Sequence, residues 1–237
     1  MLSFFTTSFA VFVHPAQPMR SLSLRARTSH RRTTATARNS QLGVGLIAVG
    51  IGVGMIIQAG LGAAAWDVLN VALAQRTGAP LGAMAMAVGV TAGALAVLCG
   101  ARPGWRSLVP VVVVSPLLEL TVRTVSTPED LVGQLGMLLA GMVLLALGVG
   151  AYIGSENGAG PADLLFLQLA GTRLPVWAAR AVLDGSVLLL GWSLGGPVGP
   201  GTLIVTAGIG PLVALSIAWF DLAAAHANTS YRQPVLV

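Results

Sequence analysis

Charged residues are scarce in this chain. They make up 9 % of its 237 residues, whereas about a quarter of the residues of an ordinary soluble domain are charged. Apolar residues make up 55 % of the chain, and the mean hydropathy is +0.82. This composition excludes a soluble globular domain and predicts an all-α integral membrane protein whose first partner is the lipid bilayer.

Lysine is absent, so all thirteen basic residues are arginine. Residues 1–41 contain no acidic residue and hold six of the thirteen, namely Arg20, Arg25, Arg27, Arg31, Arg32 and Arg38. Because the net charge of +5 comes largely from this one cluster, we expect no nucleic-acid partner. We predict a disordered Arg-rich cytoplasmic tail over residues 1–41, attracted to anionic lipid.

Cysteine and histidine are nearly missing. The single Cys99 excludes an internal disulfide and a multi-cysteine metal site. The three histidines, His14, His30 and His226, all lie near the chain ends. The sequence also has no His-Glu-x-x-His, no Gly-x-Ser-x-Gly, no phosphate-binding loop and no dinucleotide fingerprint. We therefore expect no enzyme, no catalytic residue, no metal and no cofactor.

Long apolar runs dominate what remains. A bilayer core of about 30 Å needs roughly 20 apolar residues per helix. Six stretches qualify as transmembrane helices: residues 43–60, 81–100, 108–125, 131–154, 176–194 and 202–222. Two intervening segments, 66–77 and 163–173, are too short to cross. Each is predicted to be a short helix that lies at the interface or re-enters the membrane.

The chain repeats itself. Four glycines recur at an offset of 98 residues: Gly50, Gly52, Gly60 and Gly62 return as Gly148, Gly150, Gly158 and Gly160. Later matches have an offset of 95: Gly100, Gly104, Pro116, Leu117 and Leu120 return as Gly195, Gly199, Pro211, Leu212 and Leu215. We infer a duplicated unit. The first repeat would cover residues 42–125 and the second 131–222, followed by a C-terminal tail over 223–237.

Arginine bias in the loops predicts the orientation of the spans. The N-terminal cluster, Arg102, Arg106, Arg173 and Arg232 would be cytoplasmic. Six spans of the cytoplasmic (inner) membrane, with both termini on the cytoplasmic side, satisfy this pattern. Three spans per repeat place the two copies in opposite senses, which is the inverted-repeat architecture of many secondary transporters.

Several passages resemble a known family. They are Gly60-Leu61-Gly62 with Trp66-Asp67-Val68-Leu69, Arg76-Thr77-Gly78, Gly158-Ala159-Gly160-Pro161-Ala162-Asp163, Arg180, and Gly191-Trp192-Ser193-Leu194-Gly195-Gly196 with Gly199, Gly201 and Thr202. In order and spacing they resemble the YczE/YyaS/YitT family of bacterial integral membrane proteins. The resemblance covers residues 43–222 and implies a multi-pass membrane protein. It implies no biochemical activity.

The two glycine loops carry the first candidate site. The loop-forming residues are Gly60 and Gly62 in the first half, and Gly158, Gly160 and Pro161 in the second. Asp67 and Asp163 each follow in the first turn of a short helix. There a carboxylate stabilises the exposed backbone N–H groups by about 0.3 to 1 kcal/mol. The alternative is a binding function, since irregular backbone at membrane depth is tolerated where it lines a cavity.

Two charged pairs provide the other candidates. Glu119 and Arg123 are four residues apart on the third predicted span, and Arg180 and Asp184 are four apart on the fifth. Pairs at this spacing share a helix face and can neutralise each other. Charged groups inside a span face the protein interior or water. The pairs therefore form either a structural ion-pair network or the lining of a pathway.

Two hypotheses for function follow. The first is a secondary transporter that binds a small solute or ion through the two loops and Asp67, Asp163, Glu119, Arg180 and Asp184. The second is a non-transporting membrane accessory or assembly protein, in which the loops brace the fold and the charges pair structurally.

Overall fold

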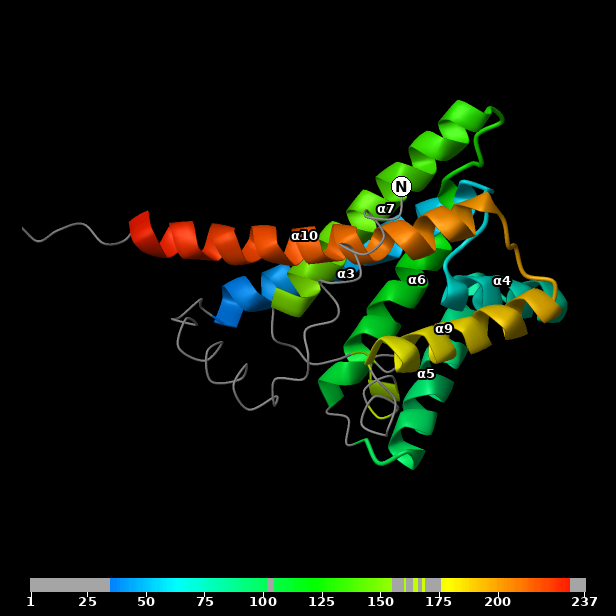
Figure 1. Cartoon of the computed structure of the whole chain (residues 1–237), viewed down its shortest axis with the longest axis horizontal. Helices are drawn as coiled ribbons and strands as arrows, with labels where there is room; N and C mark the ends of the chain where they lie inside the picture. Colours follow the sequence, from blue (N-terminus) through cyan, green and yellow to red (C-terminus); the bar gives the residue numbers. More distant parts are fainter. Residues whose placement is uncertain are drawn as a thin grey trace, which may run out of the picture.

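The computed structural model describes residues 35–101, 105–154, 160, 164, 165, 168 and 176–230. These residues form seven α-helices and one 3₁₀ turn, and no strand occurs among them. The elements are α3 (Ala35–Gln58), α4 (Ala65–Thr77), α5 (Leu81–Leu98), η1 (Trp105–Leu108), α6 (Val109–Thr124), α7 (Leu131–Gly154), α9 (Val176–Ser193) and α10 (Pro200–Ser230). Their arrangement is shown in Figure 1.

The predicted all-α class is confirmed within these residues, and the helix bounds lie close to the predicted ones. The bounds of α7 match the fourth predicted span, whereas α3 begins at Ala35, inside the predicted tail, and α10 extends to Ser230. Four helices, α3, α5, α7 and α10, are long and apolar enough to cross a membrane. The remaining two predicted spans correspond to α6 and α9. Helix α6 is shorter, with 16 residues, and α9 is less apolar, because it carries two charged residues.

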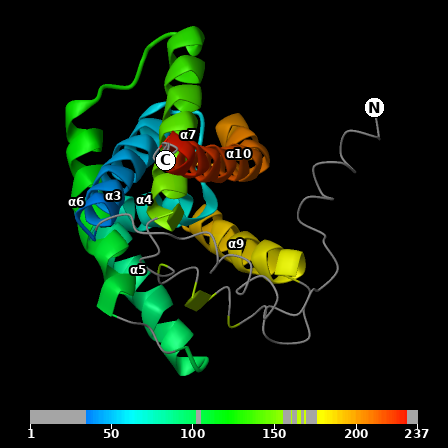
Figure 2. The same ribbon diagram turned by 90° about the vertical axis from the view of Figure 1, so that its left-hand side faces the viewer.

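The helices pack in two groups that α6 connects. The first group is α3, α7 and α10, and the second is α4, α5 and α9. Helix α6 contacts α3 on one side and α5 on the other. Figure 2 shows the same elements from the side.

Glycines allow α3 and α7 to approach until their backbones touch. A Cβ added at Gly52 would lie 2.8 Å from the carbonyl oxygen of Gly141, and one added at Gly45 would lie 2.9 Å from that of Gly148. The residue numbers rise along α3 as they fall along α7, so the two helices are antiparallel. Small residues at such a crossing give close van der Waals contact, which stabilises helix pairs in membranes.

The contact of α3 with α6 resembles the contact of α7 with α10. A Cβ at Gly54 of α3 would lie 2.6 Å from the side chain of Thr121 on α6. A Cβ at Gly150 of α7 would overlap Oγ of Ser216 on α10. In each half, therefore, a glycine of the first long helix (α3 or α7) packs against a small hydroxyl-bearing residue of the last long helix (α6 or α10).

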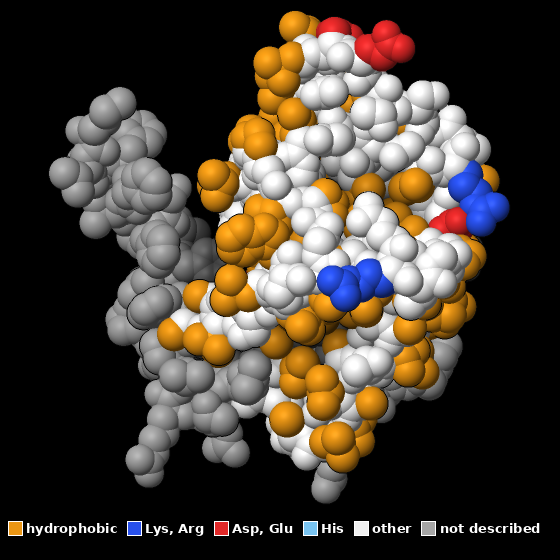
Figure 3. All heavy atoms as spheres, turned by 90° about the vertical axis from the view of Figure 1, so that its right-hand side faces the viewer, with side chains coloured by type: hydrophobic (Ala, Val, Ile, Leu, Met, Phe, Trp, Pro, Cys, Tyr) orange, Lys and Arg blue, Asp and Glu red, His pale blue; other side chains and the backbone are white. Residues whose placement is uncertain are grey.

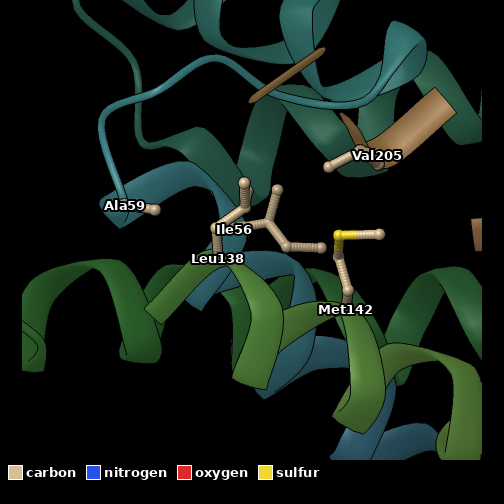
Figure 4. Packing of buried hydrophobic residues seen from close by; sticks show 5 residues of the cluster. All are labelled: Ile56, Ala59, Leu138, Met142 and Val205. Atoms are coloured by element: carbon tan, nitrogen blue, oxygen red, sulfur yellow. The ribbon is translucent and has the colours of Figure 1, made fainter. Parts of the chain in front are cut away.

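The apolar core lies where α3, α7 and α10 meet. Ile56 and Ala59 of α3 pack against Leu138 and Met142 of α7 and Val205 of α10, and each of these side chains is at most 2 % exposed. Figure 4 shows them pointing toward one another. Burying side chains of this size stabilises the fold by about 1.5 to 3 kcal/mol each where the reference state is water.

Helices α5 and α9 each end in a turn of the same geometry. Gly100 and Gly195 have positive φ angles of 98° and 89°, which residues with a Cβ rarely adopt. The Gly100 N–H donates to Val97 O at 2.9 Å, and the Gly195 N–H donates to Trp192 O at 2.8 Å. The sequence pairs these two glycines at an offset of 95, and their local geometry agrees with that pairing.

The outer surface is largely apolar. Figure 3 shows hydrophobic side chains spread over one face with few charged ones among them. Large apolar residues on three of the candidate spans are strongly exposed, such as Leu98 on α5 (82 %), Val132 on α7 (80 %) and Leu203 on α10 (74 %). In water this surface would cost free energy, whereas lipid covers it without that cost. The exposure therefore agrees with a membrane location.

Candidate functional site

The first glycine loop leads from α3 into α4. Gly60 and Gly62 adopt positive φ angles of 71° and 111°, so the loop makes a turn that other residues would strain. The loop packs on the start of α10, where the Gly201 N–H donates to Leu61 O at 2.7 Å. A Cβ at Gly62 would lie 2.5 Å from Oγ1 of Thr202. The first glycine loop is thus held by the glycine-rich start of α10, in the second half of the chain.

The second glycine loop is mostly outside the described residues. Gly158, Pro161 and Asp163 lie there, so their predicted roles stay predictions. Gly160 is described and buried, and its carbonyl oxygen accepts from the Leu164 N–H at 2.9 Å.

Asp67 lies in the first turn of α4, as predicted, and is partly buried. Its one hydrogen bond to a described residue comes from Asn70 Nδ2, at 3.4 Å. Asn70 is 6 % exposed, and its Oδ1 has no hydrogen-bond partner among the described residues. Helix α4 is too short to span the membrane. Burial raises the pKa of the Asp67 carboxyl to about 7, against the smaller lowering effect of the Asn70 hydrogen bond.

Asp184 on α9 has two partners. Its Oδ2 accepts from Arg180 Nε at 2.8 Å, which is the predicted pair within one helix. Its Oδ1 accepts from the indole Nε1 of Trp66 at 3.0 Å. The second bond crosses from α9 to α4, so Asp184 joins the two halves of the chain.

Glu119 also has a partner on another helix. Its Oε1 accepts from Arg123 Nε at 2.5 Å on the same face of α6. Its Oε2 accepts from the Gly82 N–H at 2.8 Å, at the start of α5. Because the first N–H groups of a helix have no partner within that helix, a carboxylate there stabilises it. Glu119 thus caps α5 from α6.

An open hollow of about 580 Å³ lies beside Glu119. It is formed where α3 and α6 end and α5 begins, along the last turns of α4. Its lining includes the polar side chains of Gln58, Gln75 and Glu119. Its apolar and backbone lining comes from Ile57, Val71, Ala74, Gly78, Ala79, Pro80, Leu81, Val122 and Pro197. Of the predicted site residues that the structure describes, the hollow includes Glu119 and leaves out Asp67, Arg180 and Asp184.

Three residues with clear roles were absent from the sequence-based candidates. Trp66 and Asn70 flank Asp67 on α4, and Gln58 at the end of α3 donates through Nε2 to Val122 O at 3.0 Å and to Val125 O. Asn70 could have been found, because it lies three residues after Asp67 and shares its helix face. Gln58 gave a weaker signal, as one polar residue at the end of an apolar run.

Comparisons with known proteins agree with the resemblance described above. A family described as a family of unknown function, DUF6198, matches residues 37–218. An uncharacterised protein of Haemophilus influenzae is 31 % identical over 192 residues, covering 79 % of this chain and 88 % of its own length.

Two relatives come from Bacillus subtilis. The uncharacterised membrane protein YczE is 27 % identical and covers 73 % of this chain and 82 % of its own length. The uncharacterised protein YyaS is 26 % identical and covers 68 % and 83 %. No solved structure matches. From these matches and the apolar helices, the chain belongs to the YczE/YyaS-type family of membrane proteins, DUF6198.

Proposed function

We propose that this protein has six transmembrane helices in two inverted three-helix repeats and moves a small solute or ion across the bacterial cytoplasmic membrane. Both termini would lie in the cytoplasm. One observation carries this proposal: contacts between the halves occur in pairs, and exchanging the halves turns one member of a pair into the other. Inverted repeats of this kind are the common frame of secondary transporters.

The α3–α7 crossing gives the first pair. Gly45 and Gly52 stand 96 positions before Gly141 and Gly148. Exchanging residues with that offset turns the Gly45–Gly148 contact into the Gly52–Gly141 contact. Two antiparallel spans related in this way require a two-fold axis in the plane of the membrane, since an axis along the membrane normal would leave them parallel. This supports inverted repeats.

The short segments give the second pair. A Cβ at Gly191 of α9 would lie 2.6 Å from the Leu69 N atom on α4. In the other half, Leu165 packs with Ala96 of α5 in one buried cluster. Leu69 precedes Leu165 by 96 positions, and Ala96 precedes Gly191 by 95. Helix α4 therefore packs on the second long helix of the second half, and Leu165 packs on that of the first.

Among the described residues the halves differ in the packing of their last two long helices, which favours a protein with two states. In the first half α5 packs tightly on α6, where a Cβ at Gly82 would overlap the carbonyl oxygen of Ser115. Among the described residues α9 and α10 have no comparable packing. If the halves exchanged these arrangements, the hollow beside Glu119 would close toward the outside and become accessible from the opposite side of the membrane.

Chemical labelling tests transport without knowledge of the substrate. In a Cys99→Ala background, we would place a cysteine at Ala74, in the hollow. A membrane-impermeant maleimide would then be added to intact cells and to inverted membrane vesicles. Alternating access predicts labelling of the A74C variant from both sides. The control E129C, at an exposed residue of the α6–α7 connection, should react from the outside alone.

A non-transporting accessory protein is the second candidate. It is favoured by the charged pairs, because Glu119 and Asp184 are both bound by an arginine and by a second donor inside the fold. Such groups brace helices without any ligand. Labelling of the A74C variant from one side alone, matching E129C, would contradict transport and favour this role.

A further inference from the structure

Asp67 and Asn70 lie outside the hollow, on one face of α4. We propose that they form a proton-binding site, in which Asp67 carries the proton and Asn70 is its hydrogen-bond partner. The site would make the proton the coupling ion of transport. This coupling role rests on the function proposed above.

Asn70 provides the first argument. It is 94 % buried, yet its Oδ1 has no hydrogen-bond partner in the part of the chain that the structure describes. A buried acceptor without a partner destabilises the fold, so such groups are uncommon in native structures. The group that would satisfy it is a donor, and the carboxyl of Asp67, which already contacts the Asn70 amide, becomes a donor when it is protonated.

The amide chemistry of Asn70 suits both states of Asp67. An amide side chain has a donor and an acceptor of nearly equal size, which exchange places when the group rotates by 180°. With its nitrogen toward Asp67, Asn70 donates to the carboxylate, as in this structure at 3.4 Å. With its oxygen toward Asp67, it accepts from the carboxylic acid. One residue therefore serves the charged and the neutral form.

The charged groups that the structure describes around α4 provide no fixed counter-ion for Asp67. On α9, Arg180 pairs with Asp184, which also accepts from Trp66. Helix α5, on the other side, has no charged residue. On α4 itself, Arg76 donates to Leu194 O at 2.8 Å. Asp67 forms no salt bridge with a described residue, so a proton is the positive charge that can neutralise it. Its pKa, raised by burial, agrees with this assignment.

Infrared difference spectroscopy on the full chain in lipid nanodiscs tests the site. Spectra would be recorded from pH 5 to pH 9 in potassium buffer without any solute. We expect the C=O band of one protonated carboxyl to disappear near neutral pH. The band should be absent in D67N, shifted in frequency in D67E, and unchanged in the control E129Q. In N70L it should persist to higher pH, because the hydrogen bond that favours the carboxylate is gone.

Two results would overturn the proposal. One is a neutral-pH band that stays unchanged in both D67N and D67E, which would place the proton on another group. The other is a titration that moves when potassium is replaced by sodium, which would make the site a metal-cation site. Since no solute is present, these results are independent of the labelling of the A74C variant. Failure of transport would remove the coupling role and leave the proton site standing.

Discussion

The indole Nε1 of Trp66 donates to Oδ1 of Asp184 at 3.0 Å, across 118 positions of sequence. This bond joins α4 in the first half to α9 in the second. Arg180 holds the other oxygen of the same carboxylate. A pair that the sequence places within one helix is therefore part of a contact between the two halves.

Removing this bond should loosen α4 from α9. We expect W66F to lower the free energy of unfolding by about 1 kcal/mol, the usual size for a partly exposed hydrogen bond to a charged group. A double-mutant cycle with D184L, followed by thermal unfolding in detergent, isolates the bond from the lost packing. Additive effects of W66F and D184L would mean that the bond contributes nothing.

The crossing of α3 and α7 should tolerate no added atom at its contact. G141A places a Cβ 2.8 Å from Gly52 O and 3.0 Å from Ile56, and overpacking of this kind costs about 1 to 3 kcal/mol. G136A lies on the same helix with nothing within 4 Å and is the matched control. Thermal unfolding should show a loss for G141A and no loss for G136A. Equal stability of the two variants would contradict the contact.

The first glycine loop should be more sensitive than the C-cap of α4. Gly78 has φ 69° with open space around it, so G78A tests backbone strain alone, at about 1 to 2 kcal/mol. Gly62 has φ 111° and also lies against Thr202, so G62A should cost more. Protease resistance of the two variants during heating compares them. A G62A variant that survives as well as G78A would show that the loop does not press on α10.

Asp67 should make stability fall as pH rises. Its pKa is raised from 3.8 to about 7, so between these values the folded carboxyl keeps its proton and the unfolded one has lost it. Unfolding then releases a proton, and the free energy of unfolding decreases with pH across that window. Below about pH 4 and above about pH 7 the contribution is constant. Each pKa unit corresponds to about 1.4 kcal/mol.

The variant D67N removes this titration. Its stability, measured by thermal unfolding from pH 4 to pH 8, should lack the decrease seen in the unmodified protein. E129Q, which removes an exposed carboxylate, should keep it. A decrease that persists unchanged in D67N would assign the effect to another group.

Helix positions could be predicted because length and apolar composition decide them locally. The bounds of α7 at Leu131 and Gly154 agree with the prediction to the residue. The alignment of the repeats was harder. Glycine identity pairs Gly50 with Gly148, whereas the inverted repeat proposed from the α3–α7 contacts would pair Gly52 with Gly148. In a glycine-rich run several offsets match equally well, and only the packing of one helix on another distinguishes them.

The site could be predicted in part. Glu119 and Arg123 pair as their spacing indicates, since four residues bring two side chains onto one helix face. That Glu119 also caps α5 could not be predicted, because the Gly82 N–H reaches it only through the packing of α5 on α6. The same holds for Trp66 and Asp184, which are far apart in sequence and meet through the contact of α4 with α9.

The sidedness of two equivalent helix ends tests the inverted repeat most directly. Cys99 is exposed at the end of α5, and Ser193 is exposed at the end of α9. Each of these helices ends in a turn of the same geometry. The unmodified protein and the S193C variant in a Cys99→Ala background would be treated with an impermeant thiol reagent in intact cells. Inverted repeats predict labelling of S193C and protection of Cys99 until the cells are opened. Labelling of both from the same side would contradict inverted repeats and the transport function built on them.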